Sequence, residues 1–147
     1  MPICRSRVCQ RDMSDMNFIR GGQPCKGCRL YREIRGNEGR RGHPLEISQE
    51  ELLEFYGESE VRSCHYCGIE EKFFVQQRIP TASIDDQGNP RPSLKLGIDR
   101  IDSNLPYRFD NIVICCLVCN RIKSSIFSHD EMIVIGKSVN DIWNNRR

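Results

Sequence analysis

Paired cysteines constrain the fold of this chain more than any other feature of its sequence. Nine cysteines occur among 147 residues, and Cys115 alone has no close partner among them. The other eight form four pairs: Cys4/Cys9, Cys25/Cys28, Cys64/Cys67 and Cys116/Cys119. The opening stretch MPICRSRVCQ lacks the apolar core of a secretion signal, and no later segment approaches a membrane span. We therefore expect a cytoplasmic protein, in a compartment where thiols stay reduced.

The cysteine spacing predicts two tetrahedral zinc sites, with disulfides as the competing explanation. The first site would use Cys4, Cys9, Cys25 and Cys28, although its first pair encloses four residues instead of the usual two. His43 is an alternative ligand there. The second site would use Cys64, Cys67, Cys116 and Cys119, so that one zinc joins segments far apart in the sequence. We expect His65, between the first two of these ligands, to be exposed and not a ligand.

Charge is unevenly distributed along the chain. Residues 1–45 contain ten basic and four acidic residues, an excess of six positive charges, whereas residues 46–60 contain six glutamates and no base. The basic segment could bind phosphates, and the acidic one would face away from nucleic acid. Within the basic segment, Arg29 to Arg41 is rich in Arg and Gly, which indicates a DNA-contacting arm or a loop that orders only on binding.

The region from Leu94 to Phe127 predicts a strand, a turn, a strand and a helix. Leu94, Leu96 and Ile98 alternate with polar or small residues, which is typical of a strand with one buried face and places Asp99 on the open face. Residues 102–106 are rich in turn formers, and residues 112–114 form a second apolar run, so the two strands make a hairpin. From Leu117 the apolar spacing changes to three and four, as in a short helix.

Three further elements follow from local signals. Ser48 with Glu51, and Ser128 with Glu131, match capping boxes that begin helices. The first helix would end at Gly57, and the second would present an apolar stripe for core or dimer contact. Residues 78–93 predict a loop or an exposed hairpin, in which Asp85 and Asp86 are turn residues and not metal ligands.

The motifs Ile98-Asp99-Arg100-Ile101-Asp102, Asn111 and Cys116-Leu117-Val118-Cys119-Asn120 resemble the ββα-metal motif of HNH endonucleases. The longer blocks CKGC, EFYGESEVRSCHYCGI, LGIDRIDS and CNRIKSSIFSHDEM resemble type II restriction endonucleases of that family. The resemblance implies a small α+β fold stabilised by zinc, with a ββα core flanked by two Cys4 sites, in a bacterial or phage protein. We expect residues 1–45 to form a zinc knuckle with a basic arm, and residues 46–147 to form the nuclease region.

The chemistry of phosphodiester cleavage assigns roles within this hairpin. Asp99 offers a carboxylate oxygen and Asn120 an amide oxygen, which suit Mg²⁺, with Mn²⁺ possible. The resemblance also implies that Asp99 and Asn120 bind the metal ion. It also implies that Asn111 is the central asparagine of the motif, which we expect to tie the hairpin turn together through side-chain bonds to the backbone.

The family pattern has a histidine base where this chain has Arg100, and an arginine stays protonated. Tyr107 in the turn is our candidate base, because Arg100, Arg108 and a bound metal would favour its phenolate form. Activation of water is the favoured role, and direct attack by the phenolate remains the alternative.

We predict a Mg²⁺-dependent site-specific endonuclease that acts on double-stranded DNA as a homodimer with a palindromic target. The alternatives are a monomeric phage or intron HNH nicking enzyme and a non-catalytic zinc-ribbon DNA-binding module. The residues predicted to contact DNA are Arg29, Arg32, Arg35, Arg40, Arg41, Arg108, Arg121 and Lys123.

Overall fold

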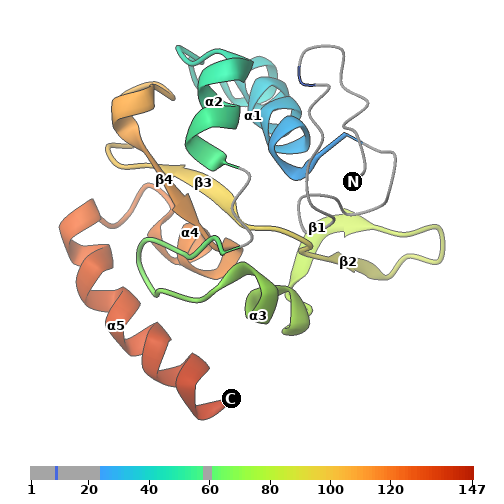
Figure 1. Cartoon of the computed structure of the whole chain (residues 1–147), viewed down its shortest axis with the longest axis vertical. Coiled ribbons are helices and arrows are strands. Elements are labelled where there is room, and N and C mark those ends of the chain that lie inside the picture. Colours follow the sequence, from blue (N-terminus) through green and yellow to red (C-terminus); the bar gives the residue numbers. More distant parts are fainter. Residues whose placement is uncertain (1–8, 10–23, 58–60) are drawn as a thin grey trace. The chain divides into compact units, whose positions relative to one another are not determined.

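The computed structural model describes Cys9, residues 24–57 and residues 61–147 (Figure 1). The elements are α1 (Lys26–Arg41), α2 (Gln49–Tyr56), α3 (Glu71–Gln76), β1 (Pro80–Ile84), β2 (Pro90–Pro92), β3 (Gly97–Arg100), the 3₁₀ turn η2 (Phe109–Asn111), β4 (Ile112–Cys115), α4 (Leu117–Lys123) and α5 (His129–Asn145). None of the helices in this described part is long and apolar enough to cross a membrane.

The chain divides into two compact units. Of the described residues, the first unit comprises Cys9, residues 24–57 and residues 103–112, and the second comprises residues 61–102 and 113–147. In the first unit, helix α2 packs against α1, and the unit also includes the hairpin turn.

Helix α1 corrects one expectation, since the segment from Arg29 to Arg41 is helical and not an irregular arm. Leu30 and Ile34 lie one turn apart and are both buried, so the helix has an apolar face that stabilises it through packing. Near the start of the helix, a Cβ at Gly27 would lie only 2.8 Å from Leu53 Cδ2 of helix α2, so this glycine permits close approach of the two helices. Gly42 ends α1 in the left-handed region, with φ of 65°.

Helix α2 has the predicted capping box. Ser48 Oγ accepts a hydrogen bond from Glu51 N at 3.1 Å, and Glu51 Oε2 accepts one from Ser48 N at 3.3 Å. The helix buries Leu52, Leu53 and Tyr56, and Phe55 packs edge-to-face against Phe109 of η2 with ring centroids 6.0 Å apart. The expected end of the helix at Gly57 is also confirmed.

The core of the second unit surrounds the strand pair β3 and β4. Leu96, Phe74 and Met132 are each fully buried in it, together with the thiols of the second cysteine group. Helix α5 begins at the second predicted capping box, in which Ser128 and Glu131 bond reciprocally. Strand β3 is shorter than expected, since it begins at Gly97 and therefore does not include Leu94, Lys95 or Leu96.

The segment between α3 and β3 forms the expected hairpin, with β1 antiparallel to β2. At its tip, Asp85 Oδ1 accepts hydrogen bonds from Gln87 N at 2.9 Å and Asn89 N at 2.8 Å. These backbone donors, Asn89 first, lower the pKa of the Asp85 carboxyl. Asp85 is therefore a turn residue, as its sequence context indicated.

Candidate metal centres and nuclease site

Four cysteines of the second unit meet as the sequence predicted. The sulfur atoms of Cys64, Cys67, Cys116 and Cys119 all lie within 4.8 Å of one another, and all four residues are buried. The Cys67 and Cys116 sulfurs are 3.8 Å apart. Two sulfurs on one tetrahedral zinc, at about 2.3 Å from the ion, are separated by roughly 3.8 Å, whereas a disulfide is about 2.05 Å long. This geometry fits zinc and not disulfides.

The backbone around this thiol group is shaped to hold it. Gly68 has φ of 73° and its N–H donates to Cys64 O at 2.8 Å, which closes the turn that carries the first two cysteines. At the start of α4, the N–H of Cys119 donates to Cys116 Sγ at 3.4 Å. Hydrogen bonds from Cys115, and then from Cys116, Cys119 and Cys67, lower the pKa of the Cys64 thiol. The pKa of Cys67 is also lowered, whereas those of Cys116 and Cys119 are raised, so a bound zinc ion would itself have to favour the thiolate form of the last two.

The unpaired Cys115 of the sequence lies beside this group but is not among the four clustered sulfurs. It is buried, and its thiol donates to Cys116 O at 3.3 Å. Cys115 is thus part of the surroundings of the zinc site.

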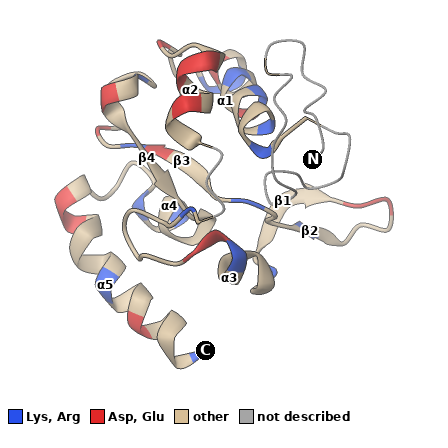
Figure 2. Cartoon of the chain, viewed as in Figure 1, with Lys and Arg blue, Asp and Glu red and all other residues tan. Residues whose placement is uncertain are grey.

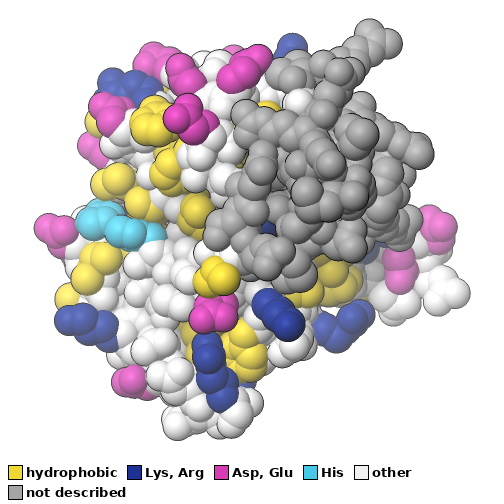
Figure 3. Space-filling model, viewed as in Figure 1, with side chains coloured by type: hydrophobic (Ala, Val, Ile, Leu, Met, Phe, Trp, Pro, Cys, Tyr) yellow, Lys and Arg dark blue, Asp and Glu magenta, His cyan; other side chains and the backbone are white. Residues whose placement is uncertain are grey.

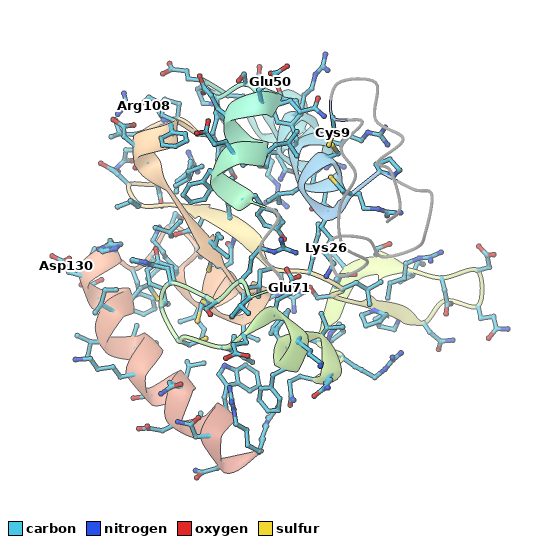
Figure 4. The ribbon with its side chains drawn as sticks, in the orientation of Figure 1. Cys9, Lys26, Glu50, Glu71, Arg108 and Asp130 are labelled. Carbon is cyan, nitrogen blue, oxygen red and sulfur yellow. The ribbon has the colours of Figure 1, made fainter. Side chains whose placement is uncertain are left out.

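The first unit holds the other thiol group. The sulfurs of Cys9, Cys25 and Cys28 lie within 4.8 Å of one another, with Cys9 and Cys25 4.0 Å apart (Cys9 is labelled in Figure 4). Gln49 Nε2 donates to Cys28 Sγ at 3.4 Å, as expected for a neighbour that stabilises a metal-bound thiolate. Among the described residues His43 does not join this group, and the predicted fourth ligand Cys4 lies outside them.

Asp99 is buried on strand β3, which corrects the expectation that it lies on an open face. It is 9% exposed, because the turn of residues 64–68, which we call the zinc turn, and helix α4 both reach its carboxylate. Tyr66 Oη donates to Asp99 Oδ2 at 2.7 Å, and Lys123 Nζ lies 3.1 Å from the same oxygen. Both partners bind Oδ2, so these two contacts hold the carboxylate through one oxygen. A ligand would bind the other oxygen, Oδ1.

Lys123 also differs from its expected role as a phosphate contact. Lys123 is 1% exposed. Its ammonium group donates to Arg100 O at 2.8 Å and also pairs with the Asp99 carboxylate. A buried ammonium needs such partners, because an unpaired charge in the interior is strongly unfavourable. Lys123 is therefore turned inward, toward the carboxylate.

Asn120 on helix α4 is tied to the same strand. Its Nδ2 donates to Ile98 O at 3.3 Å, one residue before Asp99. The amide side chain is thereby directed at β3, and its oxygen is the end not used in this bond.

Tyr66 was not identified from the sequence. It lies between two zinc ligands, where no spacing rule marks it, and only the fold brings its hydroxyl to Asp99. Burial and then the hydrogen bond to Asp99 raise the pKa of the Tyr66 phenol, so the side chain remains a donor at neutral pH.

The hairpin turn belongs to the first unit. Asn111 Nδ2 donates to Pro106 O at 3.0 Å, which is the side-chain-to-backbone bond that the sequence predicted. Tyr107 is half-buried, and its backbone pairs with the segment at Leu45 through bonds to Pro44 O and from Glu46 N. Arg108 Nε donates to Asp110 Oδ1 at 3.1 Å.

The predicted DNA contacts on α1 differ in exposure. Arg32, Arg35, Arg40 and Arg41 are exposed, and Figure 2 shows basic residues along this helix. Arg29 is half-buried and its Nε donates to Pro24 O at 3.3 Å. In the second unit, Arg121 is exposed and Arg100 is half-buried.

The strand pair followed by a short helix, with an aspartate on the first strand and an asparagine on the helix, is the ββα arrangement that the resemblance to HNH endonucleases predicted. No family model and no curated protein matches the chain. The solved structure of the rare-cutting HNH restriction endonuclease PacI, described for its mechanism of DNA perturbation, matches with a TM-score of 0.85 and 35% sequence identity over 99% of this chain and 98% of that one. The chain belongs to the family of HNH restriction endonucleases that includes PacI.

Proposed function

We propose that this protein is a DNA endonuclease that hydrolyses phosphodiester bonds at a specific site with one divalent metal ion, Mg²⁺ or Mn²⁺. The observation that carries the proposal is the match to PacI along nearly the whole chain, together with a buried Asp99 whose carboxylate is oriented by two donors. Asp99 and Asn120 are the proposed ligands. When bound, the metal would neutralise charge on the phosphate and stabilise the leaving oxygen.

Tyr66 and Lys123 act as positioning residues in this proposal. Each binds Asp99 Oδ2, and Lys123 also binds the backbone of Arg100, so the carboxylate cannot rotate freely. A ligand oxygen held in place before the metal arrives loses little entropy on binding. The shared contact supports Asp99 as the carboxylate ligand.

The remaining roles follow from side-chain chemistry. Arg100 keeps its proton and would hold a phosphate oxygen. Tyr107 is the proposed general base, with its phenolate favoured by arginines and activating a water molecule. Asn111 would keep the turn that carries Tyr107 in shape, through its bond to Pro106 O.

DNA would be bound by the basic residues Arg29, Arg32, Arg35, Arg40, Arg41, Arg108 and Arg121. A homodimer is proposed, because two identical sites related by a two-fold axis cut both strands of a palindrome. The exposed arginines of α1 support phosphate binding by the first unit.

A plasmid digest with Mg²⁺ tests the proposal. We expect linear product from the wild type, and none from Asp99→Ala at unchanged zinc content. Tyr107→Phe should cut far more slowly, and near-normal turnover would exclude Tyr107 as the base. Nicked product from a protein that sediments as a monomer on DNA would indicate the nicking enzyme, whereas tight binding without any cleavage would indicate the zinc-ribbon module.

A further inference from the structure

Lys123 places a positive charge inside the proposed nuclease site. Figure 3 shows lysine and arginine side chains on the surface of the molecule, as is usual for these residues, whereas Lys123 is 1% exposed. It is the last residue of helix α4, and its Nζ lies 3.1 Å from Asp99 Oδ2 and donates to Arg100 O at 2.8 Å. An ammonium group therefore lies next to the carboxylate that we propose as a metal ligand.

The carboxylate and the ammonium group together carry no net charge. A carboxylate that is already paired with a cation attracts a divalent ion much less than an isolated one does. Apart from the two thiol groups, the described residues form no cluster of three or more His, Cys, Asp or Glu side chains, so Asp99 is not part of a carboxylate cluster that could outweigh the lysine. The other proposed ligand, Asn120, is a neutral amide. These side chains thus offer a divalent ion no net negative charge.

A DNA phosphate supplies the negative charge that these side chains lack. Mg²⁺ is commonly bound in proteins by one or two carboxylates together with phosphate oxygens of the substrate. An ion held by Asp99 and by a phosphate oxygen at the same time is attracted by both groups. Coupling between two ligands is reciprocal, so the metal ion and the DNA then raise the affinity for each other by the same factor.

We propose that Lys123 keeps the metal affinity of the free protein low, so that the divalent ion binds tightly only together with a DNA phosphate. This inference rests on the proposed nuclease function, because it takes Asp99 as the metal ligand. Lys123 also orients Asp99, and that effect favours metal binding. The charge effect is larger, because Tyr66 Oη also holds Asp99 Oδ2, at 2.7 Å, through a hydrogen bond that does not involve the lysine.

Electron paramagnetic resonance of free Mn²⁺ measures metal binding to the zinc-loaded full chain without relying on cleavage. In the absence of DNA, we expect Lys123→Met and Lys123→Gln to bind Mn²⁺ on the order of tenfold more tightly than the wild type, because both side chains are neutral and similar in length to lysine. Lys137→Met, at an exposed position of helix α5, is the matched control and should bind as the wild type does. Thermal melting verifies that each variant is folded.

The wild type allows a second measurement that does not depend on the folding of a Lys123 variant. The probe is a labelled duplex selected from a random pool by its binding to the protein, with CaCl₂ as the source of the divalent ion. Fluorescence anisotropy should show DNA affinity about tenfold or more higher with Ca²⁺ than without it. The Asp99→Asn variant should lose this dependence on the ion.

The outcomes separate this inference from the proposed function. Mn²⁺ affinity that is equal or weaker in both neutral variants would overturn the inference and leave Lys123 with orientation alone, while Asp99 stays the ligand. DNA affinity of the wild type that does not respond to Ca²⁺ would overturn it as well. Unchanged Mn²⁺ binding in Asp99→Asn would instead overturn the proposed metal site itself, and the inference with it.

Discussion

The α-carbon of Gly136 in helix α5 lies directly against the backbone carbonyl of Tyr66 in the zinc turn, so that a Cβ at position 136 would overlap the Tyr66 carbonyl oxygen. The helix and the turn can approach this closely only because Gly136 has no side chain. The contact also supports the residue whose hydroxyl orients Asp99.

Gly136→Ala is therefore expected to destabilise the protein by about 1–3 kcal/mol or more, which is the usual cost of overpacking. The cost is not relieved by a side-chain movement, because the contact is with backbone atoms. Gly39→Ala in helix α1 is the control. A Cβ there meets nothing within 4 Å, so this change should stabilise the helix by about 0.5–1 kcal/mol. Urea unfolding measures both, and equal effects of the two substitutions would contradict the packing argument.

Arg62 and Glu71 form a buried two-point ion pair, with distances of 3.1 Å from Nε to Oε2 and 2.7 Å from Nη2 to Oε1 (Glu71 is labelled in Figure 4). Glu71 Oε2 also accepts a hydrogen bond from Leu96 N at 3.0 Å. Arg62→Met should cost about 3–5 kcal/mol, because it leaves a buried carboxylate without its cation. Exposed Lys72→Met, next to Glu71, should change the unfolding free energy by less than about 0.5 kcal/mol. A comparable loss in the two variants would refute a specific role for the pair.

The thiol groups predict a metal content that can be counted. We expect two zinc ions per chain by elemental analysis, and one in Cys67→Ser. Cys115→Ser should retain two, because Cys115 is not among the clustered sulfurs. A strong chelator should unfold the wild type, since zinc binding contributes to folding free energy in such sites. Loss of zinc from Cys115→Ser would show that the ligand assignment is wrong.

Removal of the Tyr66 hydroxyl tests the orientation of Asp99. We expect Tyr66→Phe to raise the Mg²⁺ concentration for half-maximal cleavage by about 10–100-fold, the usual effect of losing a residue that orients a ligand. Tyr31→Phe, a half-buried tyrosine of helix α1, is the control and should cleave as the wild type does. An unchanged metal requirement in Tyr66→Phe would remove Tyr66 from the proposed site.

The raised pKa of Tyr66 gives a prediction about alkaline stability. The ordinary phenol pKa is 10.0, and burial and the bond to Asp99 raise it in the folded state. A folded-state pKa above the unfolded value means that the stabilising contribution is complete below pH 10 and is lost as the pH rises beyond it. Tyr66→Phe should therefore lose less stability than the wild type above pH 10, as measured by urea unfolding across that range. A parallel loss in both proteins would contradict the assignment.

Features that depend only on neighbouring residues could be predicted from the sequence. Cysteine spacing predicted the thiol group at Cys64, and Ser48 and Ser128 marked two helix starts, because a capping box is complete within four residues. The bond from Asn111 to the Pro106 carbonyl and the turn at Asp85 are equally local, and both were predicted.

Which residues cover each predicted element depends on the packing of the whole chain. An alternating pattern identifies two faces of a strand, but it does not show that Tyr66, 33 positions away, reaches Asp99 and buries it. The inward orientation of Lys123 toward Asp99 was not predicted either, nor was the helix over the segment from Arg29 to Arg41. The contact between His65 and His129 joins residues 64 positions apart, so no local pattern indicates it. Burial and long-range pairing depend on how the elements pack, and packing is a property of the whole fold that no local pattern contains.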